Sequence, residues 1–158
     1  MAARWTEVTL VNRTHHNLRK TEDHLEHGVW DDTPPQLVGH RAVWASESDG
    51  VLTGTEGWAT FQIEMVEPDG RQTEVLGTVR LHWDNPFAGG NSYDASVNPQ
   101  ATSTGPGFSV GFFGGHGEDA RVTFVLSDGL VEVDRETGEL IVNGGYPRGG
   151  AGSSRSRL

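Results

Sequence analysis

The sequence predicts an all-β protein, a single-domain antiparallel β-sandwich of roughly nine to eleven short strands. Apolar and polar residues alternate with a period of two along most of the chain, which is typical of strands with one buried face. The segments between these runs are rich in Gly, Asn and Asp, the residues that tight turns require. The length of 158 residues suits one domain with its own core.

The clearest pair of strands lies in the middle of the chain. From Ala59 to Met65 every second residue is apolar, while the residues between them are Thr, Gln and Glu. A similar alternating run follows after Pro68-Asp69-Gly70, where Pro presets φ and Gly accepts a positive φ. We therefore expect a hairpin of about residues 57–66 and 73–83.

The rest of the chain divides into further short strands and a tail. The stretch 15–27 is compatible with either a short helix or an irregular strand. Residues 1–143 are expected to form the sandwich, and residues 144–158, rich in Gly, Ser and Arg and free of acids, a disordered tail. Further strands are expected at residues 5–11, 41–46, 92–97, 108–113, 121–126, 130–133 and 139–142.

Composition excludes several classes of function. The net charge is −10, from 12 basic and 22 acidic residues, and such a surface repels polyanions, so no nucleic-acid partner is expected. The chain has no Cys, which excludes disulfides, zinc-thiolate sites and thiol nucleophiles. Nucleophile-elbow, Walker and His-Glu-x-x-His motifs do not occur. We expect no enzyme and no cofactor, in a soluble chain without a signal peptide or membrane span.

One cluster of residues is competent to bind metal. His15, His16, His24 and His27 lie near several acids, and imidazole with carboxylate suits zinc or copper. On a strand His24 and His27 point to opposite faces, while on a helix their spacing allows chelation. A solvated polar segment is therefore the expectation and a metal site the open alternative.

The aromatic residues are more informative. Trp83 ends a predicted strand, Asn85-Pro86 breaks it, Phe87 lies on a Gly-rich loop and Tyr93 enters the next strand. A Pro-braced loop that carries aromatic rings suits insertion at the lipid headgroup boundary, and it also suits stacking on a sugar. The alternative is that Trp83 belongs to the core and Phe87 closes the end of the sandwich.

In these residues the chain resembles the aegerolysins, a family of small acidic β-sandwich proteins related to the actinoporin-like cytolysins. Three blocks carry the resemblance: residues 5–14, the Ser-Asp and Gly-Thr-x-Gly block at 48–57, and His82-Trp83-Asp84-Asn85-Pro86-Phe87 followed by Gly90-Asn91. The segment 27–30, which contains Trp30, is weakly similar as well. The resemblance covers roughly residues 5–130.

The resemblance implies a protein that binds membrane lipid, with a neutral or zwitterionic headgroup of the sphingolipid type or in a sterol-containing membrane. It also implies the docking half of a cytolytic or insecticidal pore-forming pair, with a perforin-like partner protein. Such a chain would be released by a non-classical route and act at a target membrane. The implied lipid-binding residues are Trp83, Asp84, Pro86, Phe87, Asn91, Tyr93, Glu56, Trp58 and Trp30.

This sequence departs from the aegerolysin pattern at several positions. Asn85 stands where many fungal relatives have a Cys, and Thr53 stands where some place an acid before the Gly-Thr pair. The insertion at about residues 99–107 has no counterpart. A carbohydrate-binding lectin with the same architecture is the alternative function, and an interaction protein that has lost the activity is a third.

Overall fold

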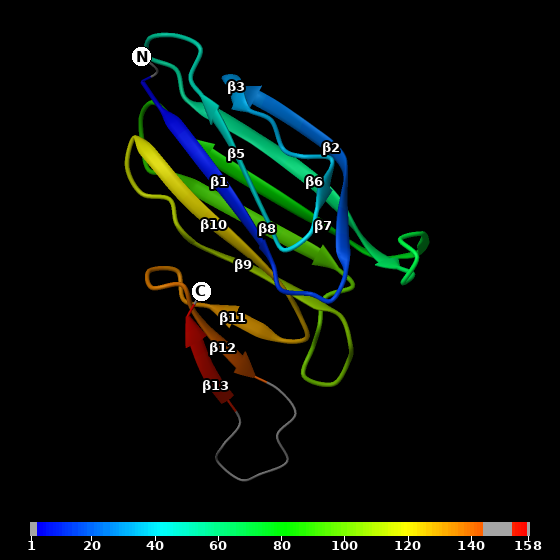
Figure 1. The fold of residues 1–158 in the computed structure, drawn as a ribbon. Helices are drawn as coiled ribbons and strands as arrows, with labels where there is room; N and C mark the ends of the chain where they lie inside the picture. The colour runs from blue at the N-terminus through cyan, green and yellow to red at the C-terminus, as the bar shows by residue number, and fades with distance from the viewer. Residues whose placement is uncertain (1–2, 144–152, 158) are drawn as a thin grey trace.

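Two five-stranded sheets pack face to face in the computed structural model, which describes residues 3–143 and 153–157 (Figure 1). No helix that could cross a membrane occurs in this part of the chain. In spatial order, the first sheet contains β3 (Val29–Asp32), β5 (Arg41–Glu47), β1 (Trp5–Asn12), β10 (Asp119–Asp128) and β9 (Phe108–Gly114).

The second sheet faces the first, and a small third sheet lies beside β9 (Figure 1). The second sheet has the order β4 (Leu37–Val38), β2 (Asn17–His27), β6 (Thr55–Val66), β7 (Gln72–Asn85) and β8 (Ser92–Asn98). The third sheet has the order β11 (Val131–Val133), β12 (Glu139–Asn143) and β13 (Ser153–Arg157). The predicted all-β sandwich is confirmed.

The hairpin predicted in the middle of the chain is β6 and β7, each a few residues longer than expected. The stretch 15–27, which the sequence left open, contains the strand β2. Its pairing with β6 shifts between Lys20 and Glu22 and again between Leu25 and His27. Each irregularity interrupts the alternation of faces, and this is why the sequence pattern of β2 was ambiguous.

One strand pair differs from the antiparallel prediction. β1 lies between β5, its antiparallel neighbour, and β10, with which it pairs in parallel from Trp5 opposite Asp119 to Asn12 opposite Leu126. The chain visits the second sheet between β1 and β10, so it can return in the same direction. Period-two alternation reports which face is buried and carries no information about strand direction.

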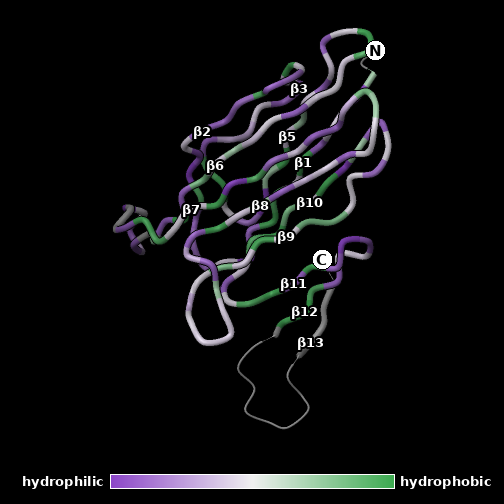
Figure 2. The backbone as a smooth tube through the Cα atoms, turned by 180° about the vertical axis from the view of Figure 1, so that it is seen from behind, coloured by the Kyte–Doolittle hydropathy of each residue, from purple (hydrophilic) through white to green (hydrophobic). Residues whose placement is uncertain are grey.

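The core fills the space between the two large sheets. The fully buried rings of Trp44 and Trp83 lie 6.0 Å apart, and Trp44 also packs 5.9 Å from Phe61. Figure 2 shows that hydrophobic and hydrophilic stretches alternate along the strands of the two large sheets. Buried aliphatic residues from both sheets, including Leu10 and Leu81, complete this core.

Three short strands were not predicted from the sequence. β3 contains two exposed acids, and β4 has only two residues, so neither shows an alternating apolar pattern. Ser153–Arg157 pairs with β12, which corrects the expected disorder for these five residues. Backbone hydrogen bonds form this pairing and need no apolar side chain. Residues 144–152 and 158 lie outside the described part, and the boundary at residue 143 stays a prediction.

Candidate functional site

Two loops meet at one end of the sandwich, next to the N-terminal residues (Figure 1). The β5–β6 loop, residues 48–54, makes a tight turn in which the Thr53 hydroxyl accepts a hydrogen bond from Gly50 N (3.1 Å) and donates one to Gly50 O (2.8 Å). This turn places Val51 and Leu52 at its tip, where they are 87% and 67% exposed. Two adjacent apolar side chains are therefore held in the solvent.

Leu52 also has a strained backbone. Its φ is +65°, in the left-handed region that costs a non-glycine residue about 1–2 kcal/mol. Residues held in such conformations concentrate at functional sites, where another requirement outweighs the strain. Burial offers no compensation here, because the Leu52 side chain is exposed. The strain and the exposure together mark this turn as a candidate contact surface.

The second loop, residues 86–91, contributes Phe87. Arg4 organises this loop because its guanidinium lies 4.9 Å from the centre of the Phe87 ring and donates hydrogen bonds to Pro86 O (3.1 Å) and Phe87 O (2.5 Å). Phe87 is 37% exposed and Val29, at the start of β3, is 43% exposed. These two residues line one open hollow of about 600 Å³ with Val51 and Leu52. We refer to Val29, Val51, Leu52 and Phe87 as the apolar tip.

Trp83 lies in the core and not at the surface, which corrects the expectation that its ring contacts lipid. It is fully buried, with its ring 6.0 Å from both Trp30 and Trp44. Its indole N–H donates a hydrogen bond to Ser46 Oγ at 3.1 Å. The alternation of β7 places Trp83 on the inner face, together with Leu81, so the core interpretation of this residue is the one that the structure supports. Trp30 is half-buried against the same core.

Tyr93 and Asn91 hold the neighbouring loop in place. The Tyr93 hydroxyl donates to Gly115 O at 2.8 Å, and its ring packs 5.7 Å from Phe112. Burial raises the pKa of Tyr93 to about 12, with a smaller contribution from the charge of Asp84. The Asn91 amide donates to Gly115 O and Gly117 O, both at 2.8 Å. In this structure these side chains therefore stabilise the edge of the sandwich.

A polar cluster lies on the outer face of the second sheet, near the apolar tip. Glu56 on β6 is directly opposite Asp84 on β7. Glu56 contacts His82 Nε2 at 2.8 Å through Oε2 and His27 Nε2 at 3.9 Å through Oε1. Burial and the charge of Glu56 raise the pKa of Asp84, while His82 and His27 oppose this shift. We refer to these four residues as the acid–histidine cluster.

Trp58 follows Glu56 on the same outer face and is partly exposed. Its indole N–H donates to Glu22 Oε1 at 3.1 Å. The His24 ring lies 4.5 Å from the Trp58 ring, and the Arg80 guanidinium carbon lies 5.0 Å from its centre. Trp58 is thus an outer-face aromatic residue, in contrast to Trp83.

Removal of the Asp84 charge is expected to stabilise the protein at neutral pH. The raised pKa means that the folded state holds this proton more tightly than the unfolded state, where the pKa is 3.8. The resulting stabilisation is complete below pH 3.8 and is lost as the pH rises through the raised pKa. Asp84→Asn should therefore have a higher free energy of unfolding than the wild type at neutral pH, by at most about 1 kcal/mol at this partly exposed site, and should unfold at a higher temperature. This advantage should vanish in acid. Thermal unfolding measured at neutral and at acid pH tests both the gain and its loss. A variant that is less stable than the wild type at neutral pH would contradict the prediction.

The four histidines of the metal alternative do not converge. His15 contacts Asp128 at 2.9 Å, His24 packs on Trp58, and His27 approaches Glu56. In the described ranges, no group of three or more His, Asp or Glu side chains is arranged to hold a metal ion.

Phe87, Pro86, Glu56 and Asp84 lie at one end of the sandwich, and their role in lipid binding stays a prediction. The structure adds Val51 and Leu52, which the sequence analysis missed. The available signal was the pair of adjacent apolar residues inside the otherwise polar turn 48–54. Val29 gave no such signal, because only the pairing of β3 with β5 places it there.

Comparison with known proteins identifies the class of fold. No family model matches this chain, and no curated protein matches it in sequence. Among solved structures, the crystal structure of lipid binding protein Nakanori is similar, with a TM-score of 0.62 over 80% of this chain and 72% of that one. The two sequences are 13% identical, so the likeness shows a shared β-sandwich fold. Membership of the aegerolysin family stays a prediction.

Proposed function

We propose that this protein binds membrane lipid and that the apolar tip is the part that enters the membrane. The observation that carries the proposal is the exposure of four apolar side chains around one hollow, with Leu52 held in a strained backbone. The acid–histidine cluster, close to this end of the second sheet, supplies groups for polar contact with headgroups. The lipid-binding description of Nakanori, which shares the fold, supports the same function.

The physical chemistry of the tip favours shallow insertion. Burial of one large apolar side chain contributes roughly 1.5–3 kcal/mol, so Val51, Leu52 and Phe87 together can hold the protein at a bilayer surface. The polar backbone of the two loops stays at the headgroup level, because its unpaired groups are costly in hydrocarbon. The net charge of −10 disfavours anionic lipid, so we infer a neutral or zwitterionic target such as sphingolipid with sterol.

The resemblance to aegerolysins extends the proposal to a binding protein that docks a perforin-like partner on the target membrane. The isolated chain is then expected to bind vesicles without releasing a trapped dye. Dye release by the purified protein alone would contradict this part of the proposal while leaving lipid binding intact.

Replacement of tip residues is expected to weaken vesicle binding without loss of stability. Leu52→Gly removes an inserted side chain and relieves the positive φ, so this variant should bind about tenfold more weakly and be at least as stable as the wild type. Phe87→Ala should show a similar loss of binding. Co-sedimentation with vesicles of sphingomyelin and cholesterol measures the affinity, and chemical denaturation measures the stability.

The matched control is Leu37→Ser, which replaces a leucine that is 58% exposed on β4, outside the tip. This variant should keep the vesicle affinity of the wild type. Equal losses for Leu37→Ser and Leu52→Gly would show that exposed leucines act without regard to position, which would contradict the role of the tip. Wild-type protein that ignores sphingolipid, sterol and phosphatidylcholine vesicles alike would overturn the proposal.

A further inference from the structure

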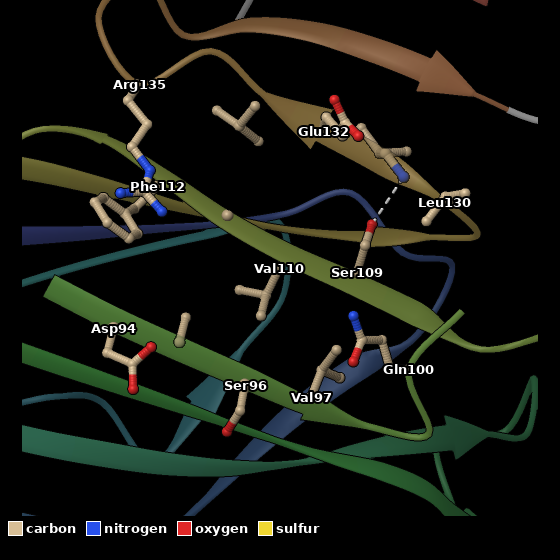
Figure 3. A pocket seen from close by; sticks show the side chains of 14 residues that line it. Asp94, Ser96, Val97, Gln100, Ser109, Val110, Phe112, Leu130, Glu132 and Arg135 are labelled. Carbon is tan, nitrogen blue, oxygen red and sulfur yellow. Dashed lines mark hydrogen bonds between the residues drawn. The ribbon is translucent and has the colours of Figure 1, made fainter. Parts of the chain in front are cut away.

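A second hollow lies on the side of the sandwich, between β8, β9 and β11 (Figure 3). β8 and β9 are the last strands of the two large sheets, and β11 of the third sheet runs close to β9. Gly111 allows this approach, because a Cβ atom at that position would lie 3.0 Å from Val133 Cγ2. Ser109 Oγ also accepts a hydrogen bond from Val131 N at 3.1 Å. The resulting groove of about 490 Å³ is within the usual size of ligand sites and shares no residue with the apolar tip.

The groove has an aliphatic floor and a polar rim. Val97 and Val110 form part of the floor, where they are half-buried against the edge of the core. Asp94 lies on the rim from β8, Glu132 from β11 and Arg135 from the turn that follows, and all three are exposed (Figure 3). The floor therefore offers apolar contact while the rim offers both donors and acceptors.

Arg135 is held in place by packing. Its guanidinium carbon lies 4.2 Å from the centre of the Phe112 ring, and Phe112 itself packs 5.8 Å from the buried Phe124. A guanidinium stacked on a ring keeps its N–H groups in its own plane, where they can still donate hydrogen bonds. Arg135 is exposed at the surface, so its guanidinium can be reached from the solvent. Its donors are thus available on one side of the groove, opposite the carboxylate of Asp94 (Figure 3).

We propose that this groove binds a neutral saccharide. A sugar hydroxyl both donates and accepts, so it can donate to Asp94 or Glu132 while a neighbouring hydroxyl accepts from Arg135. Gln100, also in the lining, carries an amide that both donates and accepts. The C–H face of a pyranose ring matches the aliphatic floor. Two carboxylates against one guanidinium leave the groove with net negative charge, which disfavours phosphorylated or sulfated ligands.

The structure disfavours two other occupants of the groove, an added peptide strand and an acyl chain. An added peptide strand needs a free sheet edge, but the chain links the end of β8 to the start of β9 through hydrogen bonds from Phe108 N to Pro99 O and from Ala101 N to Phe108 O. β11 then crowds β9 from its other side. An acyl chain needs an apolar enclosure, whereas charged side chains line this rim. A hydroxyl-rich ligand is the class that uses both the rim and the floor.

Titration of the isotopically labelled protein with lactose, N-acetylglucosamine and mannose, each at millimolar concentration, tests the proposal. At least one sugar should shift the backbone amide signals of Gln100, Gly111 and Glu132 in a saturable manner, while the signals of Val51 and Leu52 stay unchanged. Glu132→Gln and Asp94→Asn should each weaken this binding about tenfold, because a charged acceptor is lost.

Two further variants keep the test decisive. Arg135→Lys retains the charge but loses the planar pair of donors, so it should also weaken sugar binding, and its unshifted core signals would show an intact fold. Glu74→Gln, an exposed acid on β7 outside the groove, should bind sugar like the wild type. All groove variants should keep wild-type vesicle binding, so failure here is distinguishable from failure of the lipid proposal. If none of the three sugars causes a saturable shift, the inference is overturned.

Discussion

Replacement of Trp83 by alanine is expected to lower the free energy of unfolding by about 3–5 kcal/mol. The ring is fully buried between Trp30 and Trp44, and its N–H group is bonded to Ser46 Oγ. Truncation leaves a cavity at the centre of the aromatic core and removes that hydrogen bond. Urea-induced unfolding, followed by circular dichroism, measures the loss.

Two companion variants separate a structural role of Trp83 from contact with lipid. Trp83→Phe keeps most of the buried ring and loses the hydrogen bond, so it should cost about 1–2 kcal/mol and leave vesicle affinity per folded molecule unchanged. Trp58→Ala, on the outer face, should cost less stability than Trp83→Ala because Trp58 is partly exposed. A stable Trp83→Phe protein that no longer binds vesicles would show that Trp83 reaches the lipid after all.

Loss of Arg19 is expected to destabilise the protein by about 3 kcal/mol, because it leaves the carboxylate of Glu64 without its cation. Glu64 is 2% exposed, and its two oxygens accept from Arg19 Nε at 3.1 and 3.2 Å. Arg19 itself is partly exposed, so water that enters after its removal keeps the cost near the lower end of the range for buried pairs. Arg19→Met is the variant of choice, since it retains most of the apolar stem.

A double-mutant cycle measures the coupling between these two residues. Glu64→Gln in the Arg19→Met background should recover much of the lost stability, because it removes the uncompensated charge. The control is the exposed pair of Arg71 and Asp69, 2.8 Å apart, where Arg71→Met should change stability by less than about 1 kcal/mol. Purely additive effects of the Arg19 and Glu64 substitutions would contradict a coupled buried pair.

Most strands follow from the sequence because alternation and turn residues are local properties. The hairpin of β6 and β7 is clear from the alternating run that begins at Ala59 and from the turn at Pro68-Asp69-Gly70. β2 was ambiguous because two irregularities in its pairing shift the faces. β13 could not be predicted, because its Ser and Arg residues carry no apolar pattern and its pairing with β12 joins segments that are separate in the sequence.

Some residues of the candidate site could be predicted from the sequence and others could not. The sequence placed Phe87 on a loop, and the structure exposes it there. The sequence also suggested Trp83 as a lipid contact, although Trp83 lies on the same face of β7 as Leu81, and both residues are buried. Local pattern distinguishes the two faces of a strand, but only the structure shows that the face carrying Trp83 is the buried one.

What the sequence by itself determined about this protein is its fold class, most of its strands and the acidic surface that disfavours polyanions. Only the tertiary structure decided which loops and edges meet. Val51 and Phe87 are 36 positions apart, and they line one hollow with Val29 because β3 and β6 begin, and β5 and β7 end, at the same side of the sandwich. The groove beside β9 likewise exists because the third sheet folds back next to Gly111. Both surfaces depend on long-range pairing, whose energy comes from burial between distant segments and leaves no period in the local sequence.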